Sequence, residues 1–123
     1  MRVLVIDDSR AVRMIIGSIL GELGMDVVEA ADGRQALAML EENPDVELML
    51  VDWNMPQMNG FDFIRAVRSQ RAYDGVRIMM VTTETEGVQV ARALEAGASE
   101  YLMKPFTKEV LVAKLALLDV LQE

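Results

Sequence analysis

The sequence predicts an α/β fold in which a parallel sheet is covered by helices on both faces. Short apolar runs and amphipathic helical patterns alternate five times along the chain, which is typical of repeated strand–helix units. The apolar runs are nearly continuous instead of alternating with polar residues, as expected for strands that helices bury on both sides. The crossovers between neighbouring parallel strands are therefore expected to be right-handed.

The first unit starts with an apolar strand at residues 3–6, directly before two aspartates. The helix that follows is predicted from apolar residues at the spacing of one helical face: Val12, Ile15, Ile16, Ile19, Leu20 and Leu23. Ser9 is a suitable N-cap for this helix, and Gly24 is expected to end it.

The second unit consists of a strand at residues 26–30 and a helix that runs through Glu42 and ends before Pro44. Asp32 and Gln35 have the spacing of a capping box, so this helix is expected to begin between them.

The third unit consists of an apolar strand at residues 46–51 and a helix from about residue 60 to 70. Phe63, Ile64 and Val67 have the spacing of an inward-facing stripe on this helix.

The last two units place strands at residues 76–81 and 99–103, and helices at about 86–96 and from 108 nearly to 123. Gly97 is expected to end the first of these helices, and Thr107 is expected to cap the second. Leu111, Leu115 and Leu118 have the spacing of a core-facing stripe on the last helix.

The composition limits the chemistry that the chain can perform. Its 123 residues are 52% hydrophobic, enough for one core, so a single domain over residues 1–123 is expected. Twelve Lys and Arg against 20 Asp and Glu give a formal net charge of −8, which disfavours nucleic-acid binding. The chain contains no cysteine and no histidine, which excludes disulfides, thiolate metal sites and imidazole-based catalysis. No apolar run approaches the ~20 residues of a membrane span, so we expect a cytoplasmic protein without membrane contact.

Polar residues stand where four of the predicted strands end: Asp7, Asp8, Asp52, Thr82 and Lys104. The carboxyl ends of parallel strands meet at one edge of the sheet, so these side chains are expected to converge there. Each residue alone would be interpreted as a turn former, a helix cap or a solvated side chain, but their coincidence at one edge favours a site. Carboxylates ~4 Å apart repel by ~1–4 kcal/mol per pair, which a divalent cation with oxygen ligands such as Mg²⁺ relieves. A carboxylate can also attack phosphorus and form an acyl phosphate.

Six short motifs lie at or near the strand ends: Ile6-Asp7-Asp8-Ser9, Val51-Asp52-Trp53-Asn54-Met55-Pro56, Asn59-Gly60, Val81-Thr82-Thr83, Gly97-Ala98 and Lys104-Pro105-Phe106. Together they resemble the receiver domain of two-component response regulators over the whole chain, and the stand-alone receivers of chemotaxis in particular. The resemblance implies a flavodoxin-like (βα)5 domain with strand order 2-1-3-4-5 and a Lys104–Pro105 peptide bond that is usually cis.

The resemblance also implies roles for the residues at the strand ends. Asp52 would accept the phosphoryl group. Asp7, Asp8, Asp52 and the backbone carbonyl of Asn54 would hold Mg²⁺ or Mn²⁺. The ammonium group of Lys104 would bind the phosphoryl group.

Further positions match residues that control the phosphorylated state. Thr82 would hydrogen-bond to the phosphoryl group, and Tyr101 would move inward when the threonine is drawn towards it. Asn54 and Glu84 lie two residues beyond Asp52 and Thr82, where the family tunes hydrolysis of the acyl phosphate.

The function that the resemblance implies is that of a phosphorylation switch, which catalyses only its own phosphorylation and dephosphorylation. A sensor histidine kinase would donate the phosphoryl group, since the chain itself has no histidine. Output would be phosphorylation-dependent protein binding, for example to a flagellar switch component in chemotaxis. Alternatives are a phosphorelay intermediate or another stand-alone receiver without a role in motility.

Two further classes of protein fit the sequence less well. An Asp-dependent phosphatase would place an acid two residues beyond its nucleophile, where this chain has Asn54, which cannot protonate a leaving group. A flavodoxin-like cofactor binder would have a glycine-rich loop after the first strand, where this chain has two aspartates.

The last helix carries a second apolar stripe, Val110, Leu117 and Leu121, which one sheet cannot also bury. These residues are interpreted either as tolerated surface residues or as a surface for a partner or a homodimer, formed with the helix at 86–96 and the strand at 99–103. Most methionines, such as Met14, Met39, Met49 and Met80, are expected to fill the core. Arg65, Arg68 and Arg71 are expected to form a solvated helix face.

Overall fold

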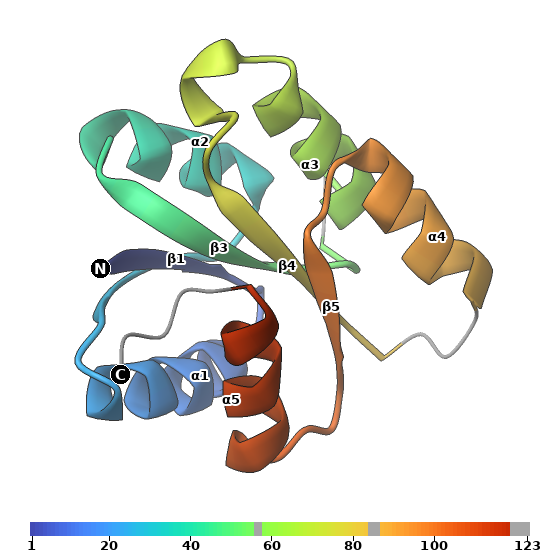
Figure 1. The fold of residues 1–123 in the computed structure, drawn as a ribbon. Helices are drawn as coiled ribbons and strands as arrows, with labels where there is room; N and C mark the ends of the chain where they lie inside the picture. The colour runs from blue at the N-terminus through green and yellow to red at the C-terminus, as the bar shows by residue number, and fades with distance from the viewer. Residues whose placement is uncertain (56–57, 84–86, 119–123) are drawn as a thin grey trace.

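The computed structural model describes residues 1–55, 58–83 and 87–118 and confirms the predicted α/β fold. Five parallel strands form one sheet in the order β2-β1-β3-β4-β5. The strands are β1 Arg2–Ile6, β2 Asp26–Ala30, β3 Val46–Asp52, β4 Arg77–Thr82 and β5 Glu100–Met103. The helices are α1 Arg10–Glu22, α2 Gly33–Glu42, α3 Gly60–Arg68, α4 Gly87–Ala96 and α5 Lys108–Leu117, with a short 3-10 helix η1 at Arg71–Tyr73. Helices α1 and α5 cover one face of the sheet, and α2, α3 and α4 cover the other (Figure 1).

The register of the sheet aligns the carboxyl ends of its strands. Ile6, the last residue of β1, pairs with Ala30 of β2 and with Val51 of β3. One step further along the sheet, Thr82 at the end of β4 pairs with Met103 at the end of β5. The residues that follow these strands therefore emerge at one edge.

Side chains cap the helices as the sequence predicts. Ser9, Asp32, Asn59 and Thr107 each accept a hydrogen bond from the backbone N–H three residues later. The predicted capping box differs in one detail, because the side chain of Gln35 accepts from the N–H of Ala31 instead of that of Asp32.

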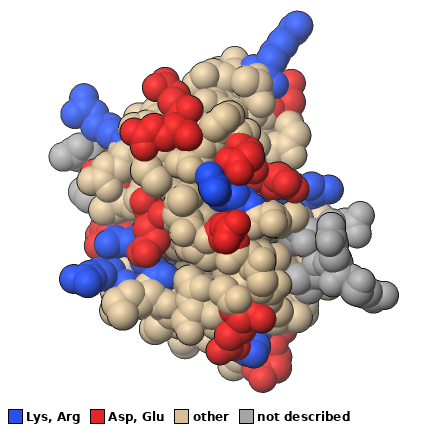
Figure 2. All heavy atoms as spheres, turned by 90° about the vertical axis from the view of Figure 1, so that its left-hand side faces the viewer, with Lys and Arg blue, Asp and Glu red and all other residues tan. Residues whose placement is uncertain are grey.

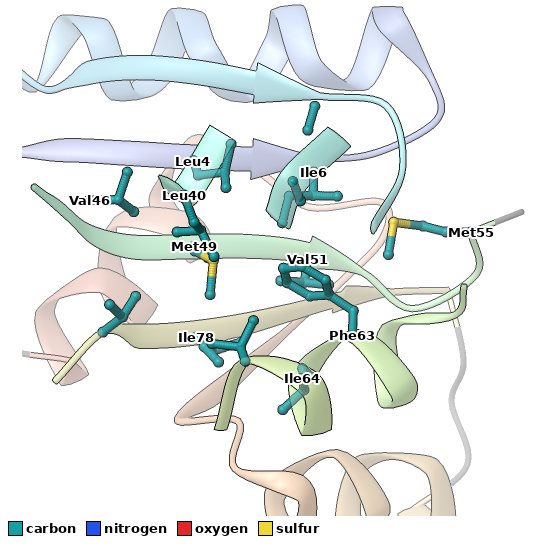
Figure 3. Packing of buried hydrophobic residues seen from close by; sticks show 14 residues of the cluster. Leu4, Ile6, Leu40, Val46, Met49, Val51, Met55, Phe63, Ile64 and Ile78 are labelled. Carbon is teal, nitrogen blue, oxygen red and sulfur yellow. The ribbon is translucent and has the colours of Figure 1, made fainter. Parts of the chain in front are cut away.

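The core lies in two layers, one on each side of the sheet. The layer under α1 and α5 includes Ile16, Leu20, Leu111 and Leu115, all at most 1% exposed. The opposite layer is formed by α2 and α3 against β1, β3 and β4, with Phe63 and Ile64 fully buried (Figure 3). Burial of a side chain of this size stabilises the fold by about 1.5–3 kcal/mol.

The buried face of α1 is narrower than its periodicity predicts. Met14 is 61% exposed and Ile15 is 56% exposed, so neither fills the core as expected. The sheet buries Ile16 and Leu20 completely, whereas side chains at neighbouring angles around the helix reach solvent. The expectation that Met14 belongs to the core was wrong.

The predicted core-facing stripe of the last helix is confirmed, since Leu111, Leu115 and Leu118 are buried. Of the second stripe, Val110 is 44% exposed and Leu117 is 70% exposed. Leu121 lies outside the described residues, as does the predicted continuation of the helix towards residue 123.

Arg68 does not belong to a solvated face, contrary to expectation. Its Nε donates to the carbonyl of Gly97 at 3.0 Å, and one Nη donates to the carbonyl of Tyr73 at 2.9 Å. Gly97 has a φ of 121°, a backbone conformation that residues with a side chain rarely adopt. A Cβ there would also lie 2.5 Å from Arg68 Cγ, so both the backbone and the available space require glycine. Arg68 thus ties the end of α3 to the turn after α4.

The acidic surface is not one continuous patch on the side shown in Figure 2, where Lys and Arg side chains are interspersed among the acids. Within the described part of the chain, no helix is long and apolar enough to cross a membrane.

Candidate functional site

The aligned strand ends place all five predicted residues at one edge of the sheet. Asp7 follows β1, Asp52 ends β3 and Thr82 ends β4, and these three are at most 5% exposed. Asp8 is exposed and Lys104, which follows β5, is half-buried. One edge of the cluster is thus open to an incoming reactant while the rest is enclosed.

Three carboxylates meet at this edge. One oxygen each from Asp7, Asp8 and Asp52 lies within 4.8 Å of the other two. Such a spacing lets all three reach one hard cation, and an all-oxygen donor set suits Mg²⁺ or Mn²⁺. The residues present therefore fit the metal that the sequence predicts.

Lys104 lies between two of these acids. Its Nζ donates to Asp7 Oδ2 at 2.8 Å and lies 3.5 Å from Asp52 Oδ1. Because Asp7 and Asp52 are almost fully buried, this ammonium group supplies positive charge where water cannot screen their repulsion.

The pKa values of Asp52 and Lys104 are both raised, but for different reasons. The pKa of Asp52 is raised from 3.8 to about 6, chiefly by burial and next by the charge of Asp7, while Lys104 and the N–H of Asn54 act in the opposite direction. Burial also lowers the pKa of Lys104, but its hydrogen bond to Asp7 and the attraction of both carboxylates outweigh burial, so the pKa of Lys104 ends above its usual value. Lys104 therefore stays protonated, whereas Asp52 loses its proton at a pH closer to neutral than an ordinary aspartate does.

Backbone contacts fix the carboxylates in place. Asp7 Oδ1 accepts from the N–H of Ser9 at 2.8 Å, and Asp52 Oδ1 accepts from the N–H of Asn54 at 3.3 Å. The N–H of Lys104 donates to the carbonyl of Thr82 at 2.7 Å, which joins the ends of β4 and β5. The Lys104–Pro105 bond is cis, as the resemblance implies.

Two residues of the site were missed from the sequence. Arg13 of α1 donates to the carbonyl of Asp7 at 2.6 Å and also pairs with Glu29 at 3.0 Å. Gly60 follows the N-cap residue Asn59, and a Cβ there would lie 2.8 Å from the carbonyl oxygen of Asp52, so α3 starts in direct contact with the backbone of Asp52. A glycine directly after an N-cap asparagine was the only signal for this contact.

The residues predicted to control the phosphorylated state are only partly described. Asn54 is exposed beside Asp52, whereas Glu84 lies outside the described residues. Tyr101 is half-buried and packs against the small cluster of Trp53, Met80 and Ala93. It lies on β5, three positions before Lys104. The ammonium group of Lys114 lies 3.9 Å from the centre of the Tyr101 ring.

The geometry is that of a small anion-handling site. The Asp52 carboxylate and the Lys104 ammonium group lie 3.5 Å apart at the edge of the sheet, where Thr82 ends the neighbouring strand, and the clustered acids can hold a divalent cation. This set suits transfer of a phosphoryl group onto a carboxylate.

Comparison with known proteins gives a consistent match. The response regulator receiver domain family matches residues 3–116. A chemotaxis protein CheY homolog of Campylobacter jejuni is 46% identical over 116 residues, covering 94% of this chain and 89% of that protein. The chemotaxis protein CheY1 of Helicobacter pylori is 45% identical, covering 94% of each chain. The structure of the chemotaxis protein CheY4 of Vibrio cholerae superposes with a TM-score of 0.88 at 39% identity and covers 98% of each chain.

Proposed function

Since this chain belongs to the response regulator receiver family and is CheY-like, we propose that it is a signalling switch operated by phosphorylation of Asp52. The observation that carries the proposal is the convergence of Asp7, Asp8 and Asp52 beside Lys104 at the carboxyl edge of the sheet. The names of the chemotaxis relatives support a role in motility control, with a phosphorelay as the alternative.

The residues of the site have distinct tasks in the proposed reaction. A carboxylate oxygen of Asp52 attacks phosphorus, the bond from phosphorus to the donor breaks, and the donor leaves with the electron pair. Lys104 and the hydroxyl of Thr82 bind phosphoryl oxygens. Asp7, Asp8, Asp52 and the carbonyl of Asn54 would hold Mg²⁺ or Mn²⁺, which supplies positive charge to the phosphoryl oxygens when bound.

The donor is proposed to be a phosphohistidine of a sensor histidine kinase. A cavity of about 320 Å³ is lined by Lys104 and by Val12, Ile15, Thr83, Pro105 and Phe106. The exposed, apolar side chain of Ile15 gives a donor domain a surface to contact while its imidazole approaches Asp52. The proposed kinase contact would therefore lie beside Lys104, at the edge of the sheet that carries the site.

Phosphorylation is proposed to shift a two-state equilibrium through Thr82 and Tyr101. Movement of Thr82 towards the phosphoryl group would make space for the half-buried Tyr101 ring to turn inward. The surface formed by α4, β5 and α5 would change as a result, and there the exposed Val110 and Leu117, with Leu121, would contact an output protein such as a flagellar switch component or a second copy of the chain.

The phosphorylated state is proposed to be short-lived. Asn54 and Glu84 stand at the positions that flank the attacking water in the family, and an amide and a carboxylate there match the fast-signalling members. A phosphoryl lifetime of hours in the purified protein would contradict this part of the proposal.

The decisive experiment uses Trp53, the only tryptophan of the chain and the neighbour of Asp52. Mg²⁺ followed by acetyl phosphate is expected to change Trp53 fluorescence in two steps, and mass spectrometry is expected to find one phosphoryl group. Asp52→Asn should abolish the second step and the mass shift. If wild type and Asp52→Asn respond alike, the proposed switch is wrong.

A further inference from the structure

A groove between α3 and α4 lies outside the phosphorylation site. These helices pack side by side on the same face of the sheet (Figure 1). The groove has a volume of about 470 Å³ and is lined by Phe61, Arg65, Arg68, Ser69, Glu95 and Ala96. A volume of this size is in the range of ligand-binding clefts.

Positive charge gathers along this groove although the chain as a whole is acidic. Arg65 and Arg68 line it, and Arg92 of α4 stands at its edge against Phe61. Among the described side chains, no carboxylate lies within 4.0 Å of any of these three arginines. The carboxylate of Asp74 acts on the charge of Arg68 without forming an ion pair with it.

The aromatic ring of Phe61 orients two of these guanidinium groups. The central carbon of the Arg92 guanidinium lies 4.6 Å from the ring centre, and that of Arg65 lies 5.7 Å from it. A guanidinium held over a ring keeps its N–H groups at its edges, where they can bind a carboxylate through two parallel hydrogen bonds. Arg68 is fixed independently by its bonds to the carbonyls of Gly97 and Tyr73.

We propose that the α3–α4 groove is a binding site for a short acidic segment of a partner protein, whose carboxylates pair with Arg65 and Arg92 across Phe61. An acidic segment is proposed because of charge complementarity: the guanidinium groups of Arg65 and Arg92 present ordered N–H donors that no described carboxylate of this chain binds.

Glu95 argues against a long polyanion as the occupant. Its exposed carboxylate lines the same groove, and the chain carries a net charge of −8, so a nucleic acid would meet repulsion beside the arginines. A short peptide with two neighbouring carboxylates and a following ammonium group matches the pattern better, since the ammonium can approach Glu95.

Occupation of the groove should be visible from inside the protein. The rings of Phe61 and Trp53 meet edge to face, with ring centres 6.1 Å apart, and Trp53 is 7% exposed. A ligand that moves Arg65 or Arg92 on Phe61 therefore changes the surroundings of the only tryptophan.

The test is a titration with the labelled tetrapeptide Glu-Glu-Ala-Lys, followed by anisotropy of the label and, with unlabelled peptide, by Trp53 fluorescence. We expect saturable binding that weakens with added salt. Arg65→Gln and Arg92→Gln should each reduce affinity by about three- to tenfold. Arg65→Lys should also lose affinity, because it keeps the charge but not the paired donors.

Two controls separate this site from general attraction. Arg34→Gln removes one exposed positive charge from α2 and should leave affinity unchanged, and the peptide Gln-Gln-Ala-Lys should not bind. The same titrations with Asp52→Asn distinguish this groove from the phosphorylation site, because peptide binding should persist there. Absence of binding at millimolar peptide, equal loss in Arg34→Gln, or tighter arginine-dependent binding of an oligothymidylate would each overturn the proposal.

Discussion

The ammonium group of Lys104 donates a hydrogen bond to Asp7 Oδ2 at 2.8 Å, although the two residues are 97 positions apart in the chain. The same Nζ lies 3.5 Å from the proposed phosphoacceptor Asp52. Lys104 therefore compensates the charge of the two most deeply buried carboxylates of the site and links the last strand to the first.

Removal of this cation is expected to destabilise the protein. Lys104→Met should lower the free energy of unfolding by about 1–3 kcal/mol at neutral pH, because it leaves Asp7 and Asp52 without their compensating charge. Urea denaturation in EDTA measures the loss. Saturating Mg²⁺ should recover part of it, and Lys114→Met, which removes a cation from the Glu100 pair instead, should show no such recovery. A loss that is insensitive to Mg²⁺ in Lys104→Met would speak against charge compensation.

Stability should depend on pH through Asp52. The pKa of Asp52 is about 6 in the folded protein against an ordinary value of 3.8, so the folded state holds the proton more tightly than the unfolded chain. The contribution of Asp52 is therefore fully present below pH 3.8 and is lost as the pH rises through about 6. In EDTA, the stability difference between Asp52→Asn and wild type should grow across this window by on the order of 2 kcal/mol, allowing for solvent screening. A difference that stays constant with pH would contradict the raised pKa.

Metal binding should stabilise the folded chain. At a Mg²⁺ concentration about a hundredfold above the dissociation constant, the expected gain is ~3 kcal/mol, seen as a higher melting temperature. Asp8→Asn should weaken this response because it removes the exposed member of the carboxylate cluster. Asp26→Asn removes an exposed acid at the start of β2 and serves as the control. An undiminished Mg²⁺ response in Asp8→Asn would remove Asp8 from the proposed ligands.

The turn after α4 should tolerate no side chain. Gly97→Ala is expected to cost about 2–4 kcal/mol, since it combines a φ of 121° with a Cβ that would lie 2.5 Å from Arg68 Cγ. Arg68→Ala in the same chain should relieve the steric part but not the backbone part, so the two substitutions should be non-additive in urea denaturation. Strict additivity would mean that the two residues do not press on each other.

The apolar surface of α5 is tested by Leu117→Glu. Because Leu117 is 70% exposed, stability should change by no more than about 0.5 kcal/mol, while phosphorylation-dependent self-association or partner capture should be lost. Met14→Glu is a matched control on α1, where the replaced side chain is 61% exposed. Sedimentation and pull-down with and without an acyl-phosphate mimic give the answer. If Leu117→Glu behaves like wild type in both assays, this surface has no such role.

The sequence predicts the elements and the strand ends well because both depend on local patterns. The strand at residues 26–30 and the helix ending at Glu42 have the bounds that the apolar runs and caps indicate. The convergence of Asp7, Asp52 and Lys104 follows from one topological rule about parallel sheets. Strand order came from the family resemblance and not from periodicity, since no local pattern states which strands are neighbours.

The features that the sequence did not predict depend on contacts between distant segments. Periodicity places Ile15 on the apolar side of α1, but how wide the buried strip is depends on how α1 sits on the sheet. Arg68 looks like its exposed neighbours until its partner, the carbonyl of Gly97, is brought to it from 29 positions away. The contact of Gly60 with the backbone of Asp52 is likewise a tertiary fact.

The alignment of the strand ends divides the molecule by its tolerance to changes in length. An added residue within β1, β3 or β4 would turn the following side chains to the other face of the sheet and scatter the site. The connections at the opposite edge, such as Asn43–Asp45 and Asp74–Val76, carry no residue of the proposed phosphorylation site, and Asp74 and Gly75 are exposed. A reporter domain inserted between Asp74 and Gly75 would therefore leave the chemistry intact. Insertions are tolerated only at the edge of the sheet opposite the site.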